Sequence, residues 1–392
     1  MLDLPFTTSP TNSIGVELEL QLIDLVSNEL SDKAMEIIGL YNDARHVKKE
    51  LTLSTIELNS SVHATPFTLY EELNVIARKL ADIAACKNCG VCGGGRHFSS
   101  NWKDQTITPT DRYQEVHHHL GFLAKLSCVF GQHIHIGVQS GDDAIYLSHA
   151  LIPYLPHFIA LSASSPYYQS VDTFFASSRF SALNSFHTFG YIEHDITTWR
   201  DFIEYVEAGV NLEVIQCLKD IYWEIRPKPE FGTIEIRVCD TPLTLFHAAM
   251  LGGYAQLLVK YLLKRKKPIA KVYDSVTHSN TFNAQRYGFT ADYIDTSSNA
   301  KIKLNVHIQQ TIETLKKLAD DNDIRVLRYM EAYLKQGIND SEQLRRMAHA
   351  GMSESSIIKT MMNLLVPAEH LSYTDIHPFR RLTHETIRSI GG

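Results

Sequence analysis

Polar and aliphatic residues alternate in three short segments of this 392-residue chain. The segments are residues 14–22 (IGVELELQL), 132–138 (QHIHIGV) and 232–240 (GTIEIRVCD). Successive side chains of a β-strand point to opposite faces, so this alternation predicts three strands, each with one polar and one aliphatic face. No other feature of the sequence constrains the fold as strongly.

The polar faces of the three predicted strands carry unusual chemistry. Their members are Glu17, Glu19 and Gln21 on the first strand, His133 and His135 on the second, and Thr233, Glu235, Arg237 and Cys239 on the third. If the strands join one sheet, carboxylates, imidazoles and a guanidinium gather on one face. Carboxylates that crowd together repel one another unless they bind cations. The pattern therefore predicts a metal site built on a sheet.

Composition places the chain among globular proteins, with 44% apolar and 21% charged residues. The net charge of −7 argues against a nucleic-acid backbone as a partner. No apolar run approaches the roughly 20 residues that span a bilayer, and no signal-peptide pattern is visible at the N-terminus. The six cysteines are few for this length and are expected to be reduced thiols in a cytoplasmic protein.

The order of predicted elements favours an α+β fold with an antiparallel sheet over a doubly wound parallel one, because short strands joined by a turn form hairpins. Helices are predicted at residues 33–43, 67–87, 110–127, 142–163, 198–208, 244–264, 302–319, 324–335, 340–349 and 353–364. Residues 162–190 are expected to form a long functional loop with short helical pieces. We expect one domain over residues 1–392, with a sheet core at roughly 10–300 and a helical part at 301–392.

Glu17 and Glu19 form the strongest candidate pair for metal binding. Each could hold its own Mg²⁺ in a site with several metals, whose paired ions lie roughly 3.5–4 Å apart. Glu57 repeats the pattern in the segment TIELN at 55–59, and Glu50 lies seven residues earlier as a weaker candidate. The alternative is a solvent-facing set of ordinary acids.

His133 and His135 need polar partners if they are buried, and they could ligate a metal or donate to a phosphate or carboxylate. The alternative is a pair of hydrogen-bonded core histidines. Glu235 and Arg237 face the same way, and a carboxylate for metal beside an arginine for phosphate suits phosphoryl transfer.

Further basic residues surround this pair. Arg226 and Lys228, on the partner strand and turn, add positive charge for a nucleotide, although a cross-strand salt bridge is the alternative. Arg179, in the long loop, could bind a substrate carboxylate or a phosphate.

The run Cys86, Cys89 and Cys92 has the spacing C-x2-C-x2-C, which raises the possibility of a zinc, iron–sulfur or redox site. No nearby fourth ligand is evident, and the other cysteines are distant in sequence. The alternative is a helix end followed by a strand start, with incidental thiols. The three histidines at 117–119 fall in a predicted helix and point in different directions, so they are interpreted as structural.

Taken in order, these segments resemble the type 2 glutamate–cysteine ligase family, also called carboxylate–amine ligases. The matching stretches are residues 14–20 (IGVELEL), 108–113 (TPTDRY), 128–137 (CVFGQHIHIG), 160–166 (ALSASSP), 176–179 (ASSR), 232–240 and 284–288 (AQRYG). The resemblance implies a glutamine-synthetase-like core, in which a curved antiparallel sheet has helices outside and the active site on its concave polar face.

The resemblance also implies ATP, two or three Mg²⁺ (or Mn²⁺) ions, small-molecule substrates and an acyl-phosphate intermediate in amide-bond formation. The metal ligands that it implies are Glu17, Glu19, Glu57, Glu235 and His135, with Glu50 weaker. Arg237 would face the phosphates, and Arg179 the acyl substrate or phosphate. His133 joins these two arginines as a candidate catalytic residue, and Arg226, Lys228 and Arg237 are the candidates for nucleotide binding.

Two stretches depart from the family pattern. Family members usually have a Gly-Thr-His-Pro-like turn where this chain has residues 94–98 (GGRHF). They usually have a Pro-Arg-like element where this chain has residues 186–190 (FHTFG). We expect both to border the substrate pocket, so metal and ATP chemistry transfer more safely than substrate identity. A member that binds nucleotide or amino acid without ligating is the alternative. Glutamate and cysteine are the family's default substrates, and a homo-oligomer is an open expectation.

Overall fold

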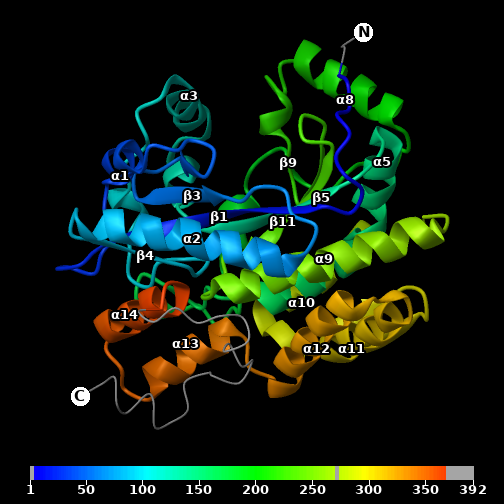
Figure 1. The fold of residues 1–392 in the computed structure, drawn as a ribbon. Helices are drawn as coiled ribbons and strands as arrows, with labels where there is room; N and C mark the ends of the chain where they lie inside the picture. The colour runs from blue at the N-terminus through cyan, green and yellow to red at the C-terminus, as the bar shows by residue number, and fades with distance from the viewer. Residues whose placement is uncertain (1–3, 270–272, 368–392) are drawn as a thin grey trace.

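The computed structural model describes residues 4–269 and 273–367. Its centre is a seven-stranded sheet in the order β10–β11–β5–β1–β3–β2, with β4 pairing the far end of β1 (Figure 1). The strands are β1 Ile14–Asp24, β2 Val47–Lys49, β3 Thr55–Asn59, β4 Cys89–Cys92, β5 Gly131–Gly137, β10 Ile225–Lys228 and β11 Thr233–Asp240. All neighbours are antiparallel. The predicted α+β class is confirmed, and the three alternating segments are adjacent strands.

The aliphatic face of the sheet rests on two long helices, α2 Pro66–Ala85 and α9 Leu245–Arg265, which lie below the sheet in Figure 1. Thr65 caps α2 by accepting from the Thr68 amide, and Pro66 begins it. The first 15 residues of α9 are buried, as expected of a helix that is covered on all sides. A Cβ at Gly252 would meet Ile14 Cδ1 at 2.5 Å, so a glycine lets α9 approach β1 closely.

Two predicted helices are broken. The helix predicted at 110–127 divides into α3 Asp111–Leu120 and α4 Phe122–Leu126 at Gly121, whose φ of +58° favours glycine. The helix predicted at 142–163 divides into α5 Gly141–Ala150 and α6 Leu155–Ser162. Pro153 lies in the 3₁₀ turn between them, and proline cannot donate a backbone hydrogen bond there. Apolar residues keep helical spacing across both breaks, so the sequence pattern did not reveal them.

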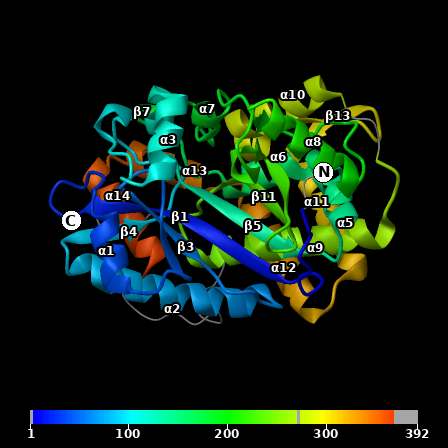
Figure 2. The same cartoon turned by 90° about the horizontal axis from the view of Figure 1, so that it is seen from above.

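The remaining helices lie around these layers (Figure 2). They are α1 Ala34–Tyr41, α7 Phe180–Leu183, α8 Trp199–Asn211, α10 Asp274–Tyr287, α11 Leu304–Leu315, α12 Asp321–Gln336, α13 Asp340–His349 and α14 Glu354–Leu365. The four last helices match four predicted segments, whereas α10 was not predicted. The end of the predicted helical part, from residue 368 on, lies outside the described residues. The single domain remains a prediction.

Short elements complete the chain. The predicted loop at 162–190 contains β6 Tyr167–Tyr168, β7 Val171–Asp172 and β8 Phe189–Gly190 besides α7, and β9 is Tyr222–Trp223. A hairpin of β12 Asp292–Asp295 and β13 Ala300–Lys303 precedes α11. Within 4–269 and 273–367, no single helix has both the length and the apolar composition to cross a membrane, and only the bent pair Gly141–Ala150 and Ile152–Ser162 would meet the test together.

A buried polar chain joins α6, α9 and α11. His157 Nδ1 lies 2.8 Å from the Tyr254 hydroxyl, and His157 Nε2 lies 2.7 Å from His307 Nδ1. Burial lowers the pKa of His157 well below its usual value, and the neighbouring His307 lowers it further. The folded protein therefore binds fewer protons here than the unfolded chain, whose histidines titrate near 6.5. This stabilisation is complete above pH 6.5 and decreases as the pH falls.

Replacing this histidine should flatten the acid side of the stability profile. Each proton that only the unfolded state binds changes stability by about 1.4 kcal/mol per pH unit. We expect His157→Gln to be less stable at pH 7 and to lose stability more slowly between pH 6.5 and 5 than the parent protein. Urea unfolding at several pH values measures both slopes, with the exposed His349→Gln as the control. Parallel profiles for all three proteins would refute this assignment.

Candidate active site

The registers of β1, β3, β5 and β11 bring the predicted site residues face to face. Glu17 is the cross-strand neighbour of His133, Glu235 that of His135, and Glu19 that of Glu57. Directly opposed side chains in antiparallel strands have Cβ atoms about 4.5–5.5 Å apart. Residues that lie more than 200 positions apart in the chain therefore share one polar surface, on the side of the sheet opposite α2 and α9.

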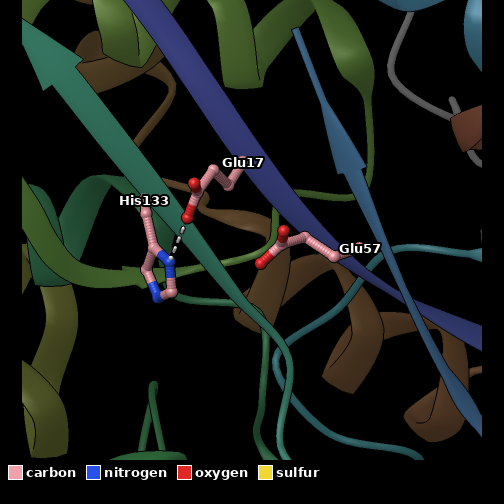
Figure 3. A group of neighbouring side chains, drawn as sticks. All are labelled: Glu17, Glu57 and His133. Atoms are coloured by element: carbon pink, nitrogen blue, oxygen red, sulfur yellow. Dashed lines mark hydrogen bonds and ion pairs between the residues drawn. The ribbon is translucent and has the colours of Figure 1, made fainter. Parts of the chain in front are cut away.

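Two groups of possible ligands form on this surface. In the first, Glu17, Glu57 and His133 offer donor atoms within 4.8 Å of one another, and Figure 3 shows them converging from three strands. In the second, Glu17, His135 and Glu235 do the same. His133 Nδ1 lies 3.1 Å from Glu17 Oε2, and His135 Nε2 lies 3.6 Å from Glu17 Oε1. Glu17 thus faces both groups, one with each carboxylate oxygen.

The donor atoms of these groups fit divalent cations. Both histidines are buried, and the Nε2 atom of each lacks a hydrogen-bond partner among the described residues. His135 is oriented through its other nitrogen, because Nδ1 lies 3.1 Å from the Thr233 hydroxyl. Metal-bound histidines are commonly held in this way. Carboxylate oxygens suit Mg²⁺ and Mn²⁺, so the chemistry of both groups agrees with the predicted cations.

Neighbouring carboxylates are held under electrostatic strain. Burial raises the pKa of Glu57, and the charge of Glu17 raises it further. Burial and the charges of Glu57 and Glu19 raise the pKa of Glu50 well above its usual value. The structure therefore brings Glu50, the weaker candidate, to the edge of the first group. Cations would relieve the repulsion among these carboxylates.

Glu19 belongs to neither group. Its Oε2 accepts a 2.5 Å hydrogen bond from the Gly131 amide, and its Oε1 lies 3.9 Å from His133 Nε2. Burial raises the pKa of Glu19, while the charges of Arg179 and Arg237 act in the opposite direction. Glu19 therefore lies between the ligand groups and the arginines, and its predicted role in metal binding remains a proposal.

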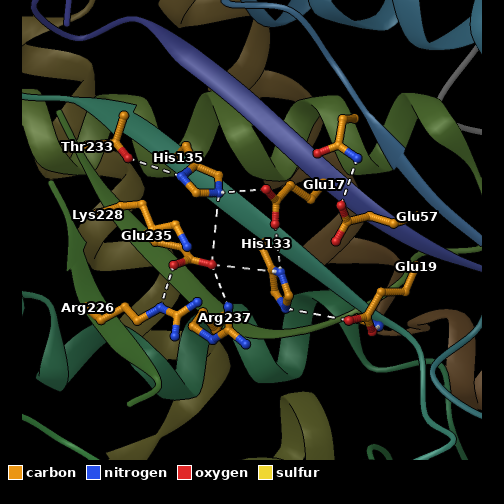
Figure 4. A network of polar contacts seen from close by, with 12 residues as sticks. Glu17, Glu19, Glu57, His133, His135, Arg226, Lys228, Thr233, Glu235 and Arg237 are labelled. Atoms are coloured by element: carbon orange, nitrogen blue, oxygen red, sulfur yellow. Dashed lines mark hydrogen bonds and ion pairs between the residues drawn. The ribbon is translucent and has the colours of Figure 1, made fainter. Parts of the chain in front are cut away.

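Glu235 anchors the basic side of the site (Figure 4). Its carboxylate accepts from Arg226 Nε at 2.7 Å and from Arg237 Nη1 at 2.5 Å. Burial alone would raise the pKa of Glu235, but these two guanidinium groups hold it well below its usual value. Arg226 also donates to the Ile221 carbonyl at 2.7 Å and is buried. The side chain of Arg237 is 19% exposed, against 9% for Arg226, so Arg237 is the one with room to contact a ligand.

The two other predicted basic residues lie at different depths. Arg179, from the loop before α7, is buried beside the site and donates to the Arg237 carbonyl at 3.2 Å. Its Nε atom has no hydrogen-bond partner among the described residues. Lys228 lies at the end of β10 and pairs with Glu230 at 3.2 Å. Arg179 is thus part of the central arrangement, and Lys228 lies at its margin.

The cysteine run does not converge. Cys89 and Cys92 lie three positions apart in β4, so their side chains point to opposite faces. The Cys89 thiol lies 3.3 Å from the Ser31 hydroxyl, and Cys86 is exposed. Among the residues with described positions, the groups able to hold a metal are the two that contain Glu17. A cysteine-based metal site therefore has no geometric support.

One predicted member of the polar face was wrong. The register shifts between Ile236 and Cys239, which places Cys239 opposite Gln132. Gln132 donates to the Ala248 carbonyl of α9, so this is the helix side of the sheet. A β-bulge adds one residue and reverses the alternation beyond it. The bulge lies just after Arg237, where simple alternation from Thr233 no longer holds.

Glu224 was missed by the sequence analysis. The Arg237 amide donates to its carbonyl at 2.9 Å, so Glu224 lies opposite Arg237 and two residues before Arg226. Glu224, Arg226 and Lys228 are spaced two residues apart, so strand alternation could have placed Glu224 on the same face. The carboxyl group is buried and borders a cavity beside Arg179. Both segments that differ from the family pattern lie near this cavity. Residues 186–190 border it through Phe189. In residues 94–98, Arg96 donates to the carbonyl of Ser178, which precedes Arg179.

A family comparison agrees with this geometry. The sequence model of glutamate–cysteine ligase family 2 matches residues 13–361. The chain belongs to this family. A protein of Bordetella avium named "Putative glutamate--cysteine ligase 2" is 39% identical over 365 residues, covering 92% of this chain and 90% of its own length. A Legionella pneumophila relative, "Putative glutamate--cysteine ligase 2-1", is 42% identical over 320 residues, which is 80% of this chain and 82% of its own.

Solved structures place this family member in the glutamine-synthetase-like fold, which confirms that prediction. Glutamate–cysteine ligase from Francisella tularensis, in complex with AMP, superposes with a TM-score of 0.70 at 12% identity, over 98% of this chain and 93% of that one. A complex of the prokaryotic ubiquitin-like protein Pup with its ligase PafA superposes with a TM-score of 0.53 at 13% identity, over 96% and 78%. Family and fold together support an ATP-dependent carboxylate–amine ligase.

Proposed function

We propose that this ligase activates a substrate carboxylate with ATP and couples it to an amine through an acyl phosphate, with glutamate and cysteine as the first substrates to test. The observation that carries the proposal is the pair of ligand groups sharing Glu17, with Arg237 and Arg179 beside them. The crowded carboxylates of Glu17, Glu19, Glu57 and Glu235 would be of little use to a protein that only binds an amino acid. They suit a protein that handles a triphosphate through cations.

Named residues divide the work. Glu17, Glu57 and His133 would hold one cation, and Glu17, His135 and Glu235 another, with Glu19 and Glu50 adjoining them. When bound, the cations would neutralise charge on the phosphate oxygens. Arg237 and Arg179 orient the phosphoryl group and the incoming carboxylate, and Arg226 keeps Glu235 in place. The polar face of the sheet is largely buried, which limits the access of water that would hydrolyse an acyl phosphate.

In the reaction, a substrate carboxylate oxygen attacks the γ-phosphorus of ATP, and the bond to the β–γ bridging oxygen breaks to release ADP. The amine then forms a carbon–nitrogen bond as the carbon–oxygen bond to phosphate breaks. The arginines are suited to the first step because they provide fixed positive charge where negative charge develops. Catalysis by orientation needs the reacting atoms within about 3–3.5 Å.

A panel of amino acids tests this function. We expect ADP release with ATP, Mg²⁺ and the correct carboxylate and amine, together with an amide product identified by mass spectrometry. L-Glutamate with L-cysteine is the first pair, and pairs that lack either partner are the controls. Tight ATP binding by calorimetry, with no turnover across the whole panel, would instead establish the binding-only alternative that the two departing segments raised.

A further inference from the structure

A small cavity extends the site away from the ligand groups. It has a volume of about 20 Å³, enough for a group the size of a water molecule or an ammonium, and lies between the loop before α7 and strands β9 to β11. Its polar walls are Arg179, Arg237 and Glu224, and its apolar walls include Phe189, Tyr222 and Trp223. The two guanidinium groups belong to the site already described, so the cavity borders the proposed acyl-phosphate position.

Among the described residues, Glu224 is the carboxylate whose buried oxygen is left without a hydrogen-bond partner. Glu224 is only 3% exposed, and its Oε2 atom has no hydrogen-bond partner among the described residues. A buried carboxyl oxygen without a partner is costly, at about 1–3 kcal/mol or more. Such an atom points to a ligand that would donate to it.

The unpartnered oxygen of Glu224 suits a small group that donates a hydrogen bond. Burial raises its pKa to about 8, while a hydrogen bond from Tyr191 and the charge of Arg179 act in the opposite direction. The groups that face it are Tyr191 after β8, Arg179 before α7 and Arg237 on β11. None of them provides a hydrogen bond to Oε2. A protonated amine entering beside the aromatic walls would provide one.

We propose that Glu224 binds the amino group of the amine substrate in this cavity and accepts a proton from it. This inference rests on the proposed ligase function and adds the residue that recognises the acceptor. In its ionised form, Glu224 takes one proton from the ammonium and becomes neutral, which burial favours, and the neutral amine then attacks the acyl carbon. The carbon–oxygen bond to phosphate breaks with its electron pair leaving on phosphate, and the second proton leaves the nitrogen to that phosphate.

An acceptor that is uncharged at neutral pH separates this role from a structural one. Hydroxylamine is uncharged at neutral pH, so it needs neither ammonium binding nor deprotonation before attack, yet it captures an acyl phosphate as a hydroxamate. We expect Glu224→Gln to lower kcat/KM for the amine at least about 100-fold, within the range for loss of a positioned base. Its KM for ATP and its hydroxamate formation should stay within about threefold of the parent protein. The exposed Glu193→Gln is the matched control and should behave as the parent does.

Each outcome decides between the claims. The assay uses the carboxylate and amine of highest turnover in the panel, with hydroxylamine replacing the amine in the second arm. Equal loss of amide and hydroxamate in Glu224→Gln would overturn the role of Glu224 while leaving the ligase function intact. Unchanged amide formation would overturn it as well. A parent protein that forms neither product from any carboxylate would overturn both proposals.

Discussion

Replacing Glu17 by glutamine should abolish ligase turnover, with a loss of at least about 10³-fold in kcat. The reason is that both ligand groups contain this carboxylate, one through each oxygen. An amide has nearly the same size but no charge, so it cannot offset two divalent cations. Loss of a single positioned electrostatic contact already costs about 10²–10³-fold in enzymes, and this change removes two. ADP release in the panel assay measures the effect.

The Glu17→Gln variant should nevertheless fold. Burial would raise the pKa of Glu17, but hydrogen bonds with His133 and His135 hold it below its usual value. Glutamine can keep a hydrogen bond to His133, and the loss of charge relieves the repulsion with Glu57 in the absence of metal. We expect a thermal midpoint close to that of the parent protein. Glu71→Gln, on the exposed side of α2, is the control and should retain full turnover. Glu17→Gln turnover within about threefold of the parent would show that the ligand groups have no part in the reaction.

The second large effect should separate two arginines that bind the same carboxylate. Arg237→Met is expected to lower kcat about 10²–10³-fold, because its partly exposed guanidinium faces the proposed phosphoryl position. Arg226→Met is expected to destabilise the fold by about 3–5 kcal/mol, because the buried carboxylate of Glu235 then loses one of the two guanidinium groups that neutralise its charge. Steady-state kinetics and urea unfolding of both variants distinguish the two roles.

Opposite assignments would be visible in the same experiment. If Arg226→Met folded with parental stability but lost turnover, Arg226 would be the residue that contacts phosphate. If Arg237→Met kept its turnover, no guanidinium at that position would be needed for the reaction. Lys316→Met is a suitable control, because its ion pairs with Glu313 and Glu331 lie on the helical part of the chain, far along the sequence from the sheet.

Much of the polar face could be predicted, because strand alternation is a local property. Glu17, His133, His135 and Glu235 needed only that their segments be strands of one sheet. Which residues stand opposite one another could not be read from the sequence, since the register depends on pairing between strands that are distant in the chain. The resemblance to a family provided the missing assumption that these strands are neighbours.

Other features were hidden for particular physical reasons. Glu50 lies outside a strand, so no periodicity placed it near Glu57; in the structure the charges of Glu57 and Glu19, together with burial, raise its pKa. The bulge after Arg237 is a register defect with no sequence signature of its own, and it made the placement of Cys239 wrong. Helix α10 was missed because its apolar pattern is weak, with polar residues such as Asn280 and Gln285 buried in it.

The central claim is that side chains from β1, β3, β5 and β11 form one divalent-cation site able to bind a triphosphate. Titrating Mn²⁺ into metal-free protein with a non-hydrolysable ATP analogue, followed by electron paramagnetic resonance, tests it most directly. We expect two protein-bound Mn²⁺ ions per chain, magnetically coupled as at a separation of roughly 3.5–4 Å, and loss of the coupled signal in Glu17→Gln. Mn²⁺ that binds only as a nucleotide complex, with a spectrum unchanged by Glu17→Gln, would contradict the account.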